Sequence, residues 1–110
     1  MKLNFNMATS SLPPKASFFR VKRKTVNAVQ LEWKFSGWNC LNDPNQYVVE
    51  LQSENGWVEV FRTTEDYCMI TELSPNTVYV MRIFACSSKG KGPVTKMATK
   101  TKFVPNQWHG

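Results

Sequence analysis

The sequence holds few of the residues that metal and redox chemistry need. It contains one histidine, His109, and no two cysteines at Cys-x-x-Cys spacing. A zinc site is therefore not expected, because structural zinc is held by clustered Cys and His side chains. No Cys/His pair, Ser-His-Asp set or phosphate-binding glycine motif stands out. No apolar run reaches the roughly 18 residues of a membrane span. We expect no catalysis, no metal, no cofactor and no membrane span.

Cysteine usage bears on the cellular compartment. There are three cysteines, Cys40, Cys68 and Cys86, and an odd number cannot pair completely within one chain. No Asn-x-Ser/Thr glycosylation sequon occurs, and the first six residues contain no continuous apolar segment of a signal peptide. These features favour an intracellular setting, cytoplasm or nucleus, while an extracellular one stays open.

Charge is divided unevenly along the chain. Residues 1–24 carry six basic side chains and no acid, and residues 89–110 carry five basic side chains and no acid. Residues 25–88 carry three basic and eight acidic side chains, so the net charge of +6 comes from the two ends. These ends form one basic surface only if they meet in space.

The 110 residues are enough for one domain. Apolar and polar residues alternate over short stretches, most clearly in 28–35, where Val29, Leu31 and Trp33 share a face. This two-residue period predicts half-buried strands. Seven strands are expected, at Ala16–Lys22, Ala28–Phe35, Tyr47–Gln52, Trp57–Arg62, Tyr67–Ile70, Val78–Cys86 and Val94–Thr101. Seven short strands without a helical period predict an all-β, antiparallel β-sandwich.

The domain is expected to span 13–102, between a disordered leader at 1–12 and a tail at 103–110. Inward positions of the strands form the predicted core. Its members are Phe19, Val21, Val29, Leu31, Trp33, Tyr47, Val49, Leu51, Cys68, Ile70, Leu73, Tyr79, Met81, Ile83 and Ala85. The hydroxyl of Tyr79 is placed to bond back to the backbone near the preceding turn, as in a tyrosine corner.

Several motifs between 13 and 102 resemble the fibronectin type III domain. Prolines precede the first strand, the second strand carries Leu31-Glu32-Trp33, and the third begins Tyr47-Val48-Val49. The most diagnostic stretch is Leu-x-Pro-x-Thr-x-Tyr at 73–79, followed by an alternating strand and a Gly-rich turn at 88–93. The resemblance implies a seven-stranded, immunoglobulin-like sandwich that serves as one module of a larger protein. The turn lacks Arg-Gly-Asp, so the integrin-binding motif of some family members is absent.

Two groups of residues are candidates for partner binding. In the family the first and last strands lie toward the same side, so basic residues of both would share one flank. The candidates are Arg20, Lys22, Arg23, Lys24, Lys96 and Lys100, with Lys89 and Lys91 at the end of the flank. Such a flank attracts acidic groups, although lysines at sheet edges also simply prevent unwanted strand pairing. The second candidate is Trp38, because loop tryptophans are enriched in binding hot spots; the other reading has it folding over the end of the sandwich.

The sequence therefore predicts a non-catalytic interaction or scaffolding module, monomeric by itself, whose partner is another protein. A spacer or adhesion module of a receptor or extracellular protein is the first alternative. Electrostatic attachment to nucleic acid or an anionic membrane is the second. Nucleic acid is the weaker option, because no aromatic residues interleave with the lysines of the last strand.

Overall fold

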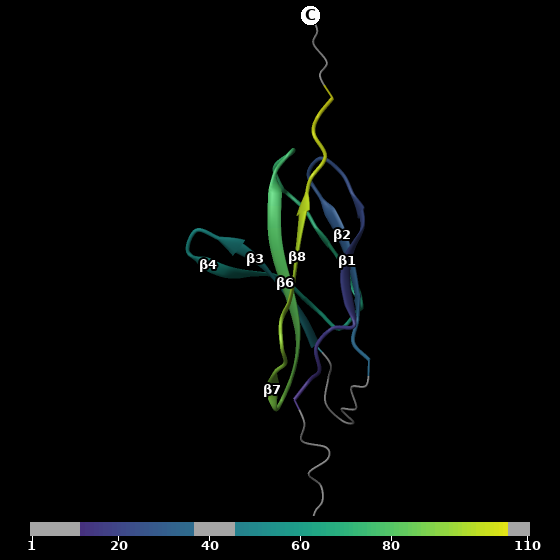
Figure 1. Ribbon diagram of the computed structural model, residues 1–110, viewed down its shortest axis with the longest axis vertical. Coiled ribbons are helices and arrows are strands. Elements are labelled where there is room, and N and C mark those ends of the chain that lie inside the picture. The colour runs from purple at the N-terminus through teal and green to yellow at the C-terminus, as the bar shows by residue number, and fades with distance from the viewer. Residues whose placement is uncertain (1–11, 37–45, 106–110) are drawn as a thin grey trace, which may run out of the picture.

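The computed structural model describes residues 12–36 and 46–105. Within these residues the chain forms eight strands and no helix, arranged as two facing antiparallel sheets (Figure 1). The predicted β-sandwich is thus confirmed. The strands are β1 (Phe18–Lys24), β2 (Val29–Lys34), β3 (Gln46–Ser53), β4 (Gly56–Thr63), β5 (Tyr67–Ile70), β6 (Val78–Ser87), β7 (Gly90–Lys91) and β8 (Thr95–Lys100).

One sheet has the order β1-β2-β5, and the other has the order β4-β3-β6-β7, with β8 also paired to β6. Strand β8 pairs with residues 78–83 of β6, and β7 pairs with the last two residues of β6. The sequence predicted seven strands and a loop at 87–93. It missed β7 because a strand of two residues, Gly90–Lys91, is too short to show an alternating pattern.

A tight turn joins β3 to β4, as the Asn55-Gly56 pair predicts. Gly56 has a φ of 112°, which glycine adopts easily because it has no Cβ. The hydroxyl of Ser53 donates a hydrogen bond to the carbonyl of Gly56 over 2.8 Å. The end of this hairpin projects from the sandwich (Figure 1).

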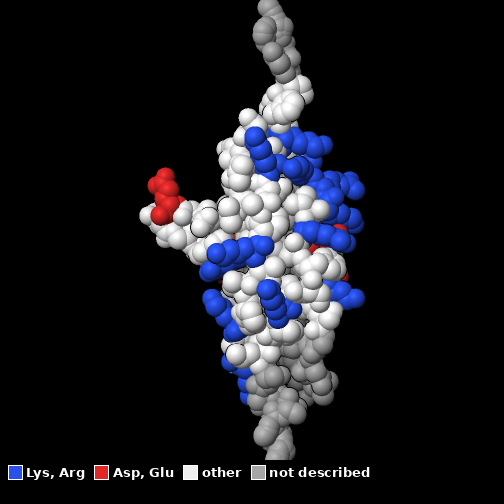
Figure 2. Space-filling model, viewed as in Figure 1, with Lys and Arg blue, Asp and Glu red and all other residues white. Residues whose placement is uncertain are grey.

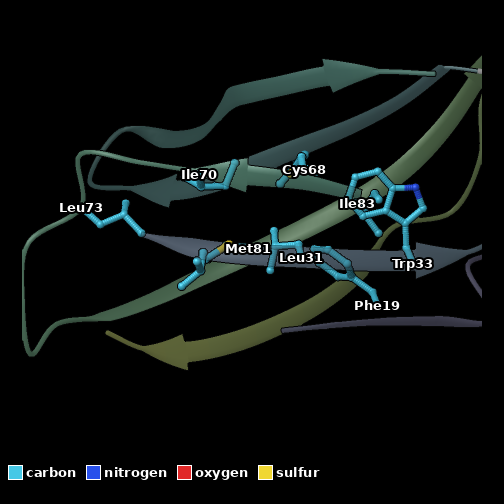
Figure 3. Close-up of a cluster of buried hydrophobic side chains, with 10 residues drawn as sticks. Phe19, Leu31, Trp33, Cys68, Ile70, Leu73, Met81 and Ile83 are labelled. Atoms are coloured by element: carbon cyan, nitrogen blue, oxygen red, sulfur yellow. The ribbon is translucent and has the colours of Figure 1, made fainter. Parts of the chain in front are cut away.

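The core lies between the two sheets, and Trp33 is its largest fully buried side chain. Figure 3 shows Trp33 close to Phe19 and Ile83, with Leu31, Met81 and Ile70 farther along the same layer. The Trp33 ring meets the rings of Phe19 and Tyr47 edge-on, at centroid distances of 6.3 and 5.9 Å. The buried positions include Val29, Val49, Cys68, Leu73 and Ala85, whereas Val21, Tyr47, Leu51 and Tyr79 are half-buried and pack against the core.

Two buried side chains, Val48 and Phe84, are absent from the predicted core. They pair with each other across β3 and β6, on the face opposite to that of the buried Val49 and Ile83. The ammonium of Lys91 lies 4.6 Å from the Phe84 ring centroid and helps to cover it. An uninterrupted apolar pair or triplet, as in 47–49 and 83–85, is the signal of a strand covered on both faces.

The predicted tyrosine corner is confirmed. The amide of Ser74 donates a hydrogen bond to the Tyr79 hydroxyl over 2.8 Å. Nearby, the buried hydroxyl of Thr101 donates to the carbonyl of Ser74 over 2.6 Å and accepts from the amide of Thr77 over 3.0 Å. These bonds tie the end of β8 to the turn before β6.

Candidate functional site

The first and last strands of the sandwich lie next to each other, although they belong to different sheets. β1 contacts β8, and the amide of Lys102 donates a hydrogen bond to the carbonyl of Thr25 over 3.0 Å. The two basic ends of the chain therefore meet on one side of the molecule. We call Arg20, Lys22, Arg23, Lys24, Lys96 and Lys100 the basic flank.

Five of the six charges on the basic flank have no acidic partner among the described residues. The exception is Arg20, whose Nε lies 2.8 Å from Oε2 of Glu32. That pair neutralises the Arg20 charge locally and leaves Lys22, Arg23 and Lys24 as the available cations of β1. Figure 2 shows the result, with blue side chains over the β1 and β8 side and red ones on the β3–β4 hairpin.

The two β8 lysines of the flank lie on the outer face of their sheet. Lys96 pairs with Arg82 and Lys100 pairs with Val78 across β6. The Lys96 ammonium lies 5.8 Å from the Trp57 ring centroid, and the Arg82 guanidinium lies 4.3 Å from the same centroid. Contact with a ring face positions a cation without neutralising its charge. Lys96 is therefore oriented and still able to attract an anion.

Lys89 and Lys91 lie at the other end of β6 from Lys100. β7 pairs with residues 86 and 87, whereas Lys100 pairs with Val78, eight and nine positions earlier. At about 3.4 Å per residue this separation is roughly 30 Å. The two lysines extend the line of positive charge at its far end rather than joining the cluster around Lys24. Trp38, the other candidate for partner binding, lies outside the described residues.

The structure also shows an ion pair between Glu50 and Arg82 that the sequence analysis did not predict. Arg82 Nε lies 2.6 Å from Oε1 of Glu50, and both side chains are largely buried. This pair forms across β3 and β6, where the two residues are direct register partners. The alternating pattern alone predicts that Glu50 and Arg82 point outward. That they face each other depends on the register between β3 and β6, which no local motif predicts.

A second cluster surrounds Arg62 on β4. Its guanidinium donates to the Glu59 carboxylate over 2.8 and 3.0 Å, to Oε1 of Gln46 over 3.0 Å, and to Sγ of Cys86 over 3.7 Å. The hydrogen bonds from Arg62 hold the pKa of Glu59 below its usual range, and the same bonds raise the pKa of Arg62. No basic residue lies next to Cys86 in the sequence, and the fold brings Arg62 to it across the sheet.

A family model of the fibronectin type III domain matches residues 12–101. The chain belongs to this family. Among curated proteins, tyrosine-protein phosphatase Lar of Drosophila melanogaster is 29% identical over 94 residues, which make up 83% of this chain and 4% of Lar. The chain thus spans a small fraction of that relative, and the phosphatase activity in its name is a property of Lar.

Solved structures share the sandwich. A fibronectin type III domain of human fibronectin type III domain containing protein 3 has a TM-score of 0.77 at 16% identity, with 96% of this chain and 100% of that one covered. FN3tt has a TM-score of 0.71 at 21% identity, with 84% and 97% covered. At these identities the likeness concerns the fold. Fibronectin type III domains are in general non-catalytic modules, commonly used in protein interaction and adhesion.

Nothing in the described part of this fibronectin type III domain suggests catalysis. Those residues hold no group of three or more His, Cys, Asp and Glu side chains that could bind a metal ion. They also contain no helix that could span a membrane. Burial raises the pKa of the Cys68 thiol to about 12, so Cys68 is protonated at neutral pH and is a poor nucleophile.

Proposed function

We propose that this fibronectin type III domain is a non-catalytic interaction module that binds an acidic protein through its basic flank. The observation that carries the proposal is the meeting of β1 and β8, which gathers the positive charge of both chain ends on one side. Among the described acids, Glu32, Glu50 and Glu59 are already paired with arginines. A partner with clustered carboxylates would therefore meet little repulsion.

The setting that we propose is intracellular, within a longer protein. The free thiols of Cys68 and Cys86 support it, because they lie on different sheets and do not form a disulfide. An extracellular spacer role would give the basic flank no ligand. Attachment to nucleic acid or to an anionic membrane would use the same charges, so the experiment must separate these partners from protein.

The experiment is a pull-down from cell lysate with three versions of the domain, at low and at moderate salt, read by mass spectrometry. The test variant carries Lys22→Glu, Arg23→Glu and Lys24→Glu. The control carries Lys15→Glu, Lys34→Glu, Gln52→Glu and Thr71→Glu, which lower the net charge by the same amount at positions away from the flank and its far end. These four control side chains are exposed and form no side-chain hydrogen bond or ion pair within the described residues, so both variants should keep their fold.

We expect a set of acidic proteins that the wild type and the control retain and the flank variant loses. Nuclease treatment of the lysate should not change that set. Equal loss with both variants would contradict a defined flank, since only net charge would then matter. Recovery of nucleic acid or lipid alone, lost with rising salt, would favour the electrostatic alternative.

A further inference from the structure

A groove of about 470 Å³ opens at the end of the basic flank, where the chain leaves β8. Its volume falls within the roughly 300–1,000 Å³ typical of clefts that hold small ligands or single anchoring groups. The residues that line it come from three separate segments: the end of β1, the turn before β6, and the chain after β8. They include Lys24, Asn76, Lys100, Thr101, Lys102 and Phe103.

Backbone hydrogen bonds fix the floor of this groove. The amide of Asn76 donates to the carbonyl of Lys102 over 3.0 Å, and the amide of Lys102 donates to the carbonyl of Thr25 over 3.0 Å. Thr101, only 2% exposed, anchors the same stretch through its hydroxyl bond to Ser74. These bonds hold the backbone of the groove floor in place, so binding needs little reordering there.

The lining combines two kinds of chemistry. Lys24, Lys100 and Lys102 supply positive charge, and none of the described carboxylates lines the groove. Phe103 supplies an apolar wall and is 65% exposed, so its ring surface is available to a ligand. A complementary ligand has an apolar group that enters the groove and carboxylates on either side of it that meet the lysines.

We propose that the groove seats one apolar side chain, such as Leu or Phe, of an acidic peptide segment in the partner protein. This proposal rests on the proposed function and specifies the chemistry of the partner. A lipid surface would meet the same lysines and the exposed Phe103 ring, and the vesicle arm of the experiment separates it from a peptide. Single-stranded nucleic acid stacks on several successive aromatic rings, and among the described residues Phe103 alone supplies an aromatic ring to the groove.

The experiment uses two fluorescent peptides of equal length and charge, titrated with the domain by fluorescence anisotropy. Both are Glu-rich; one has a central Phe and the other a central Ser. The variant Phe103→Ser removes the apolar wall. The control, Val104→Ser, changes an adjacent residue that is 54% exposed and does not line the groove. Both substituted positions are exposed, so the melting temperature should stay unchanged in each variant.

We expect the Phe peptide to bind about tenfold more tightly than the Ser peptide, as one buried apolar side chain allows. Phe103→Ser should abolish this difference, and Val104→Ser should preserve it. Equal binding of both peptides, unaffected by Phe103→Ser, would show that the groove seats no apolar side chain. Binding of acidic peptides by the basic flank would still stand. If neither peptide bound, the proposal that the basic flank binds acidic protein segments would itself be contradicted. Stronger binding to anionic vesicles or to a single-stranded oligonucleotide than to the Phe peptide would overturn the peptide as ligand.

Discussion

The amide of Lys102 and the carbonyl of Thr25 form a 3.0 Å hydrogen bond between segments 77 positions apart in the sequence. Thr25 follows β1, and Lys102 follows β8. This bond closes the sandwich where its two sheets meet. It also brings the basic residues of both chain ends to one side, so the fold itself creates the basic flank and the groove at its end.

Replacing Trp33 with Ala should destabilise the domain by about 3–5 kcal/mol, because it opens a cavity between the sheets. Trp33 is 2% exposed and contacts Phe19 and Tyr47. Its indole N–H has no hydrogen-bond partner among the described residues, so Trp33→Phe should cost clearly less than Trp33→Ala. Urea melts of the three proteins measure this. A loss below about 1 kcal/mol for Trp33→Ala would show that the indole does not fill the core.

Replacing Tyr79 with Phe should cost about 1 kcal/mol, the usual net worth of one hydrogen bond. The substitution removes the acceptor of the Ser74 amide and keeps the ring that packs on the core. Denaturant unfolding gives the free energy, and hydrogen exchange of the Ser74 amide gives a local readout. Unchanged protection of that amide would contradict the tyrosine corner.

Replacing Gly92 with Ala should destabilise the domain by about 1–3 kcal/mol through overpacking. A Cβ at position 92 would collide with the carbonyl oxygen of Pro13, which is backbone and cannot move aside. Gly56→Ala is an informative comparison: nothing lies near its added Cβ, and its cost arises from the φ of 112°. Deletion of residues 1–14 removes Pro13, so Gly92→Ala should cost less in the truncated domain than in the full chain, whereas the cost of Gly56→Ala should be the same in both. Thermal melts of these variants measure the difference.

The Cys68 thiol should make the stability depend on alkaline pH. Its pKa is about 12 in the folded protein because of burial, against an ordinary value of 9.0. The unfolded chain therefore releases this proton first, and stability that is full below about pH 9 falls as the pH rises toward 12. Relative to Cys68→Ala, the wild type should lose up to about 1.4 kcal/mol per pH unit in that window. Urea melts of both proteins at pH 8 and 10 test this, and an unchanged difference between them would refute it.

Much of the fold could be predicted from the sequence because its strands alternate clearly. Leu31 and Trp33 in β2, and Met81 and Ile83 in β6, follow a strict two-residue period and are buried. The Asn55-Gly56 turn likewise depends on local backbone preference. Val48 and Phe84 are missing from the predicted core because they occupy outward positions in the alternating pattern. Their burial depends on cross-strand neighbours such as Lys91.

Less of the candidate site could be predicted from the sequence. The family resemblance predicted that β1 and β8 lie on one side, but not that Glu32 pairs with Arg20. The Glu50–Arg82 pair and the Arg62 contact with Cys86 arise from the registers of β3, β4 and β6. The groove needs three segments to converge near Asn76. Such long-range geometry has no local signature in the chain.

The most direct test of the basic flank is a nuclear magnetic resonance titration of the ¹⁵N-labelled domain with an acidic peptide of alternating Glu and Ser. We expect the largest amide shifts at residues 22–25 and 96–102, with the Lys22→Glu, Arg23→Glu, Lys24→Glu variant showing little response. The control variant at positions 15, 34, 52 and 71 should respond like the wild type. Shifts centred on the β3–β4 hairpin, or an equal response from both variants, would contradict the account.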